Sequence, residues 1–114
     1  MKKFILIVLV SLIGISVQAQ EKKSKNKKVV FKVAGNCGMC EKRIEKAAFS
    51  VKGVKDAEWH VDCQDIHLVI DETKCSAEDV AKAIAKVGHD TSVIKTEDSI
   101  YDKLHGCCLY ERMK

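Results

Sequence analysis

Hydrophobic and polar residues alternate in some stretches of the chain and recur at helical spacing in others. The alternating or β-branched stretches predict strands at 29–33, 57–62, 66–70 and 91–94. Apolar residues at positions i, i+3, i+4 and i+7 predict two amphipathic helices, one through residues 44–51 and one through residues 80–87. In the second strand we expect Ala57, Trp59 and Val61 to face the core, so that Trp59 is a core residue and not a site residue.

Capping residues mark where these helices begin and end. The first helix is expected to begin near Gly38 and to end with Gly53 as its C′ glycine. Ser76 is expected to cap the second helix, with Asp79 supplying a carboxylate to its first turn. Gly88 then closes this second helix.

The predicted order of elements is strand, helix, strand, strand, helix, strand. This order indicates an α+β, ferredoxin-like βαββαβ sandwich, with an antiparallel four-stranded sheet and both helices on one of its faces. Following the chain direction through this topology brings three loops to one end of the sheet. They are the loop before the first helix, the turn at Cys63, and the segment 88–90 after the second helix.

Two cysteines stand where the first predicted strand gives way to the first helix. Cys37 and Cys40 form a Cys-x-x-Cys within Gly-Asn-Cys-Gly-Met-Cys, residues 35–40. At a helix start this spacing brings the two sulfurs within reach of each other, and the helix dipole and free N–H groups favour thiolates. Thiolates are soft ligands, so the pair predicts a site for a thiophilic metal ion.

These features resemble the heavy-metal-associated domain family over about residues 28–96. The resemblance is carried by the Cys37/Cys40 pair, by Val-Lys-Gly-Val at 51–54 and by Ala-Lys-Val-Gly-His-Asp at 85–90. It implies a ferredoxin-like domain that binds metal, is not an enzyme, and exchanges its ion with a donor or acceptor protein such as a metal transporter. Residues 97–114 form a C-terminal extension beyond the family's core.

The family resemblance also bears on the metal. Zinc-type members tend to carry an acidic residue beside the cysteine pair, whereas Asn36 is neutral here, which favours Cu(I). Zn(II) prefers four ligands, and this loop supplies two. A metal-bridged homodimer with two such pairs can complete a four-ligand shell. Hg(II) suits a two-thiolate site as well as Cu(I) does, so mercuric-ion binding and transport is an alternative.

The sequence leaves two other interpretations of this region open. A Cys-x-x-Cys at a helix start is also typical of thiol–disulfide oxidoreductases, although this chain contains no proline for the cis-proline loop of thioredoxin-like enzymes. His89, in the loop beside the pair, is either a further metal ligand or an exposed turn residue. His60 and His67 are expected on the outward faces of their strands.

Four further cysteines lie outside this pair. A helix of about nine residues, beginning near residue 96, would rise roughly 13 Å and return the C-terminal Cys-Cys to the first pair. Cys107 and Cys108 are therefore candidate metal ligands, with a disulfide to Cys63 or a disordered tail as the alternatives. Cys63 and Cys75 stand at opposite ends of one strand, too far apart to form a disulfide with each other.

The N-terminus has the pattern of a secretory signal peptide at residues 1–19. Lys2 and Lys3 precede an apolar stretch at 4–17, and small residues follow. This stretch has about fourteen residues, fewer than the roughly twenty that span a bilayer. We expect cleavage after Ala19 and a periplasmic protein, with an uncleaved anchor as the alternative.

Composition adds few constraints. The 114 residues suffice for one domain, and the net charge of +4 comes largely from lysines in a leader at residues 20–27. This leader is expected to be solvated and flexible, and we expect no nucleic-acid partner.

Overall fold

The computed structural model describes residues 23–114, so the signal peptide predicted at 1–19 lies outside the described residues. Its elements are β1 (Lys27–Lys32), α2 (Gly38–Phe49), β2 (Val54–His60), β3 (Asp65–Ile70), α3 (Ala77–Lys86), α4 (Asp98–Tyr101) and the 3₁₀ turn η1 (Gly106–Cys108). Within residues 23–114, no helix has the length and apolar character needed to cross a membrane.

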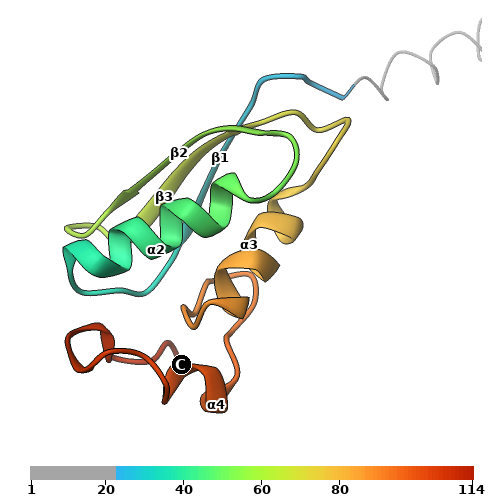
Figure 1. Ribbon diagram of the computed structural model, residues 1–114. Coiled ribbons are helices and arrows are strands. Elements are labelled where there is room, and N and C mark those ends of the chain that lie inside the picture. Colours follow the sequence, from blue (N-terminus) through green and yellow to red (C-terminus); the bar gives the residue numbers. More distant parts are fainter. Residues whose placement is uncertain (1–22) are drawn as a thin grey trace, which may run out of the picture.

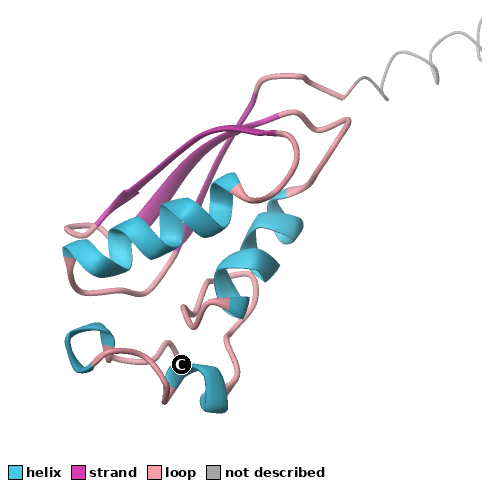
Figure 2. Ribbon diagram, viewed as in Figure 1, coloured by secondary structure: helices cyan, strands magenta, loops and turns pink. Residues whose placement is uncertain are grey.

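The three strands form one antiparallel sheet in the order β1-β3-β2, and α2 and α3 lie on the same face of it (Figure 1, Figure 2). The inward side chains of β2 and β3 are Ala57, Trp59, Ile66, Leu68 and Ile70, and each is at most 4% exposed. The α+β class and the element order from β1 to α3 are therefore as the hydrophobic pattern predicts.

The inward face of β2 is shorter than expected. The strand ends at His60, and Val61 lies in the turn before β3 with its side chain 48% exposed. The prediction that Val61 faces the core was wrong, because the alternation of side chains holds only while the chain stays in the pleat. His60 and His67 are exposed, as predicted.

Helix α2 packs on the sheet through Ile44, Ala47 and Ala48, all of which are buried. It ends earlier than predicted, with Ser50 as its C-cap. Gly53 does take the left-handed conformation, with φ of +105°, but it lies in the connection to β2 and is not the C′ residue of the helix. A Cβ at Gly53 would stand 2.8 Å from the Cβ of Lys74, so close packing also requires glycine there.

Helix α3 begins and ends as the sequence predicts. The Ser76 hydroxyl accepts a hydrogen bond from the Asp79 N–H, and the Asp79 carboxylate accepts one from the Ser76 N–H, which completes a capping box. Gly88 follows the C-cap residue Val87 with φ of +104°.

The predicted fourth strand is absent from the described part of the chain. This segment forms no ladder with β1: an isolated bridge joins Thr91 to Val33, just after the strand, and the N–H of Lys32 donates to the Ser92 hydroxyl at 3.2 Å. The Thr91 hydroxyl accepts hydrogen bonds from the N–H groups of Val93 and Ile94 and donates one to the carbonyl of Ile94. The prediction failed because this side chain competes for the backbone groups that a strand would use, and so forms a tight turn.

The C-terminal tail, residues 96–114, folds back onto the domain (Figure 1). Helix α4 has only four residues, so the helix of about nine residues predicted here was wrong. After α4 the chain turns at Leu104, which packs against Gly88 so closely that a Cβ on this glycine would stand 2.9 Å from it. The red tail in Figure 1 then passes beneath the N-terminal end of α2.

A buried carboxylate anchors this tail. Asp90 is fully buried and accepts hydrogen bonds from Arg112 at both of its oxygens, at 2.6 and 3.0 Å. The backbone N–H groups of Thr96 and Met113 also donate to it, at 3.0 and 3.1 Å. Burial opposes ionisation of Asp90, but these donors outweigh it and lower the pKa of the carboxyl below its usual range. The tail is therefore bound through a charged, nearly saturated acceptor.

Tyr110 makes a second attachment. Its hydroxyl donates to the carbonyl of Gly88 at 2.6 Å and accepts from the N–H of Asp90 at 2.8 Å. Its ring stacks on the imidazole of His89, with centroids 5.2 Å apart. Tyr110 and Arg112 together hold residues 108–113 against the loop that follows α3.

Replacing Arg112 with methionine should test this anchor. The Arg112→Met variant keeps an apolar stem but leaves the buried Asp90 carboxylate without its cation. We expect the free energy of unfolding, measured by urea denaturation, to fall by about 2–4 kcal/mol. The exposed Lys114→Met is the matched control and should change it by less than about 0.5 kcal/mol. Equal effects of the two substitutions would show that the ion pair does not hold the tail.

Candidate metal centre

The loop between β1 and α2 is fixed from below by Trp59. Its indole N–H donates to the carbonyl of Val33 at 2.9 Å. The same ring lies under Gly35, where a Cβ would stand 3.0 Å from two of its atoms. A glycine at this point lets the backbone descend onto the indole, and this packing sets the height at which the following cysteines begin.

Gln64 holds the same loop from the side. This residue has φ of +59° in the turn between β2 and β3, and its side-chain oxygen accepts from the N–H of Gly35 at 2.9 Å. Its backbone carbonyl accepts from the N–H of Val33 at 2.8 Å. The β2–β3 turn and the loop before α2 therefore lie at the same end of the sheet, as the topology predicts.

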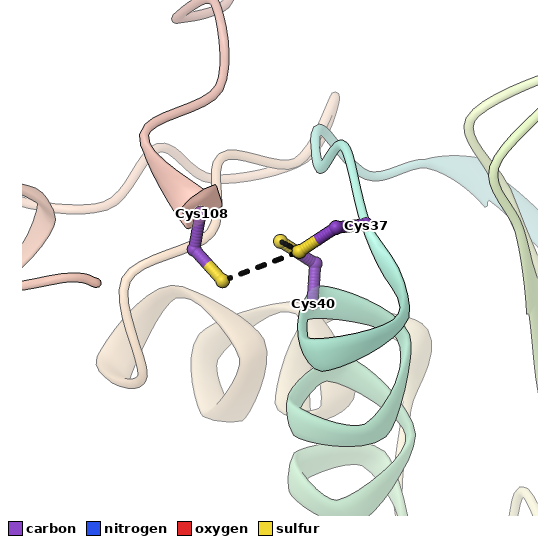
Figure 3. Close-up of side chains that lie close together, drawn as sticks. All are labelled: Cys37, Cys40 and Cys108. Carbon is purple, nitrogen blue, oxygen red and sulfur yellow. Dashed lines mark hydrogen bonds between the residues drawn. The ribbon is translucent and has the colours of Figure 1, made fainter. Parts of the chain in front are cut away.

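Three cysteine sulfurs converge at this end. Cys37 is the N-cap residue of α2, and Cys40 lies one turn later on the buried side of the helix. Cys37 Sγ lies 3.4 Å from Cys40 Sγ and 3.5 Å from Cys108 Sγ, and all three sulfurs lie within 4.8 Å of one another. In Figure 3 the side chain of Cys108 points from the tail toward the pair on α2. All six cysteines of the chain are free thiols.

The thiols of the Cys-x-x-Cys differ in acidity. The backbone N–H of Cys40 and the neighbouring thiols donate to the Cys37 sulfur, and together they lower the pKa of Cys37 to about 7 against the opposing effect of burial. Burial raises the pKa of Cys40 to about 12. The Cys40 thiol donates a hydrogen bond to the side-chain oxygen of Asn36 at 3.3 Å. Near neutral pH, Cys37 is therefore ionised far more readily than Cys40.

His89 lies beside this site but outside the sulfur cluster. Its Nδ1 contacts the carbonyl of Ala34 at 2.9 Å, so the proton is on Nδ1. The side chain is fully buried, and burial lowers the pKa of its imidazole. His89 is therefore not an exposed turn residue. The group of potential ligands found within residues 23–114 consists of three cysteines and does not include His89.

Of the remaining cysteines, Cys107 contacts the cluster, whereas Cys63 and Cys75 are not among its sulfur contacts. Cys107 Sγ lies 4.0 Å from Cys37 Sγ and 3.9 Å from Cys108 Sγ, and its side chain is exposed. Cys63 is exposed and is not bonded to Cys107 or Cys108, and Cys75 is buried next to Gly53. The prediction that Cys63 and Cys75 do not pair with each other agrees with this arrangement.

Sequence reasoning did not find the residues that bring Cys108 to the pair. Asp90 and Arg112 stand 22 residues apart, and no periodic pattern connects them. The sequence also gave no role to Met39, whose sulfur lies 3.5 Å from that of Cys107. The available signal was that two soft side chains, Cys107 and Cys108, are adjacent in the tail.

Comparison with known proteins gives matches at the level of structure alone. No family model matches the chain, and no curated protein matches its sequence. The CopZ metallochaperone is 24% identical with a TM-score of 0.55, and the match covers 57% of this chain and 98% of CopZ. Oxidized MerP from Ralstonia metallidurans CH34 is 26% identical with a TM-score of 0.56, and the match covers 59% and 94%.

A third match is the N-terminal domain of a potential copper-translocating P-type ATPase from Bacillus subtilis, solved in the Cu(I)-loaded state. It is 26% identical with a TM-score of 0.56, and the match covers 66% of this chain and 95% of that domain. The chain resembles the heavy-metal-associated proteins. The sequence motifs indicate the same family, and these three solved structures share the α+β fold of this chain.

The acidity of Cys37 generates a direct prediction. In the reduced, metal-free protein, the rate of iodoacetamide modification at Cys37 should rise with pH through a midpoint near 7, because only the thiolate reacts. Cys40 should stay unmodified over the same range, since it is buried and protonated. Peptide mapping by mass spectrometry separates the sites. A midpoint for Cys37 near the ordinary thiol value of about 8.5 would contradict the assignment.

Proposed function

We propose that this chain is an exported, non-enzymatic protein that binds Cu(I) through Cys37, Cys40 and Cys108 and passes it to another protein. The observation that carries the proposal is the convergence of these three sulfurs, two from the start of α2 and one from the tail. Soft thiolates favour Cu(I) over harder ions. Similarity to a domain solved in the Cu(I)-loaded state supports the same choice.

The sulfur spacing favours three-coordinate binding. With a metal–thiolate bond of about 2.3 Å, sulfurs around a trigonal ion stand about 4.0 Å apart, and those around a linear ion about 4.6 Å apart. Cys37 Sγ lies 3.4 and 3.5 Å from its two neighbours, so only a small outward movement gives the trigonal arrangement. A linear Hg(II) site would need a larger outward movement of the sulfurs, and Zn(II) would need a fourth ligand. Hg(II) remains the alternative cargo for the same thiolates.

Transfer would proceed by ligand exchange. Cys37 is the half-buried member of the three, whereas Cys40 and Cys108 are buried, so an incoming thiolate of a partner protein reaches the ion on the Cys37 side. The partner's sulfur joins the ion as one of the chain's sulfurs leaves, and no free ion forms. Because Cys108 supplies in the same chain what a second copy would otherwise supply, we propose that the loaded protein is a monomer and not a metal-bridged homodimer.

The residues that support export are those of the predicted signal peptide at 1–19. Export to the periplasm would place the site in an oxidising compartment, where Cu(I) also protects the thiols that bind it. The partner would be a metal donor or acceptor there, such as a metal transporter.

A thiol–disulfide oxidoreductase is the second candidate, and one observation favours it. Cys37 combines a lowered pKa with a neighbouring protonated thiol at 3.4 Å, which is the arrangement that thiol–disulfide exchange requires. Against it, the third sulfur at 3.5 Å has no use in a two-cysteine exchange reaction.

Titration of the exported protein should separate these functions. The chain is expressed with its N-terminal segment in a bacterial host, and the exported form, expected to begin near Gln20, is reduced and titrated anaerobically with Cu(I), Zn(II) and Hg(II) against chromophoric chelators. We expect Cu(I) to bind at least 100-fold more tightly than Zn(II), with the chain remaining monomeric by sedimentation.

Cys37→Ser should weaken Cu(I) binding by at least 100-fold, because Cys37 contacts both other sulfurs. The exposed Cys63→Ser is the matched control and should bind as the native chain does. Insulin reduction without retention of Cu(I) would favour the oxidoreductase. Retention of Cu(I) by Cys37→Ser at native affinity would place the metal elsewhere.

A further inference from the structure

The sulfurs at this end of the molecule extend beyond the three proposed ligands. Cys107 Sγ lies 4.0 Å from Cys37 Sγ, 3.9 Å from Cys108 Sγ and 3.5 Å from the thioether sulfur of Met39. Met39 is 46% exposed, and Cys107 is exposed as well. Five sulfur atoms thus form one continuous set of contacts that runs from the buried Cys40 to the protein surface.

A 3₁₀ turn makes this arrangement possible. Side chains of adjacent residues usually diverge, but residues 106–108 form η1, in which the N–H of Cys108 donates to the carbonyl of His105 at 2.8 Å. This tight turn leaves both sulfurs on the side that faces α2. The turn is held in place by Tyr110, two residues later, through its bonds to the loop after α3.

The sulfurs can be described as two triangles that share one edge. The shared edge is Cys37–Cys108, at 3.5 Å, and Cys40 completes the first triangle. Cys107 completes the second, with sides of 3.5, 3.9 and 4.0 Å. A trigonal thiolate site with bonds of about 2.3 Å has sides of about 4.0 Å, so the second triangle matches a three-coordinate ion at least as well as the first.

We propose that the cluster binds a second Cu(I) ion through Cys107, Cys37 and Cys108, with Met39 as an additional soft neighbour. This inference rests on the proposed Cu(I) function. Cys37 and Cys108 bridge the two ions, since a thiolate sulfur has lone pairs for more than one metal. Each thiol that becomes a ligand releases its proton to solvent. Copper remains Cu(I) throughout, so binding requires no oxidant or reductant.

A single four-thiolate Zn(II) ion is the competing use of the same sulfurs. A tetrahedral site needs every pair of sulfurs about 3.8 Å apart. Cys107 contacts Cys37 and Cys108 but is not a member of the close group that contains Cys40. Two trigonal ions therefore suit this arrangement better than one tetrahedral ion.

The two sites differ in access. The first site has two buried sulfurs, whereas the second has an exposed cysteine and the exposed Met39 beside it. The second ion is therefore the one that a partner protein meets first. Thioether sulfur is a neutral, soft ligand, so Met39 can bind Cu(I) transiently before the thiolates do, without adding negative charge.

The test is a Cu(I) titration of the reduced protein against bicinchoninate, with sedimentation to count chains. We expect two Cu(I) per monomer, with copper–copper scattering in the X-ray absorption spectrum of the fully loaded form. Cys107→Ser should bind one Cu(I), with the affinity of the first ion changed less than threefold. Met39→Leu should weaken only the second ion, by about three- to tenfold. The exposed Cys63→Ser is the matched control and should bind two.

One Cu(I) per native chain, bound equally by Cys107→Ser, would overturn the second site and leave the proposed function intact. Two ions per chain found only in a dimer would also overturn it, since the second ion would then lie between chains. Failure of the native chain to bind any Cu(I) would refute the proposed function itself. A single tightly bound Zn(II) that requires Cys107 would assign the four thiolates to zinc.

Discussion

A carboxylate that is removed from water must be paired and hydrogen-bonded to remain charged, and Asp90 meets this condition with groups from both sides of the site. Its side chain accepts from Arg112, Thr96 and Met113, while its backbone carbonyl accepts from the N–H of Ala34 at 2.9 Å in the loop before α2. One residue therefore links the loop that carries the Cys-x-x-Cys to the tail that carries Cys108. This link helps to hold the two sources of sulfur against each other.

The sulfur cluster is graded from the interior to the surface. Cys40 and Cys108 are buried, Cys37 is half-buried, and Cys107 and Met39 are exposed. Within the Cys-x-x-Cys, hydrogen bonds led by that of the Cys40 N–H lower the pKa of Cys37, whereas burial raises the pKa of Cys40. A soft ion can thus meet an existing thiolate near the surface, and its own charge then favours loss of the protons from the deeper thiols. Such a gradient suits a protein that holds its cargo and later releases it.

Much of this fold can be predicted from local sequence. The strand faces at Ile66, Leu68 and Ile70 and the capping box at Ser76 follow from rules that involve only neighbouring residues, and the structure has them. The prediction of a fourth strand was wrong because the Thr91 hydroxyl forms hydrogen bonds with backbone groups of its own turn, which a strand would need for pairing. Propensity and alternation contain no information about such competition.

For the site, the spacing of Cys37 and Cys40 predicted a metal-binding pair, and a nine-residue helix was predicted to return Cys108 to it. The structure has Cys108 beside the pair but lacks that helix. The sequence could not choose between His89 and the tail as the source of a further ligand. That choice depends on the long-range Asp90–Arg112 pair, which holds the tail with Cys108 near Cys37, and on the burial of His89, whose Nδ1 contacts the carbonyl of Ala34.

The most direct test of the account is the number of sulfur atoms around Cu(I) in protein loaded with less than one equivalent. X-ray absorption at the copper edge measures this number. The account predicts three sulfur neighbours in the native chain and two in Cys108→Ser, because the tail supplies the third thiolate. Two sulfur neighbours in the native chain would contradict it, whatever the variant shows, and would mean that the tail covers the metal without binding it.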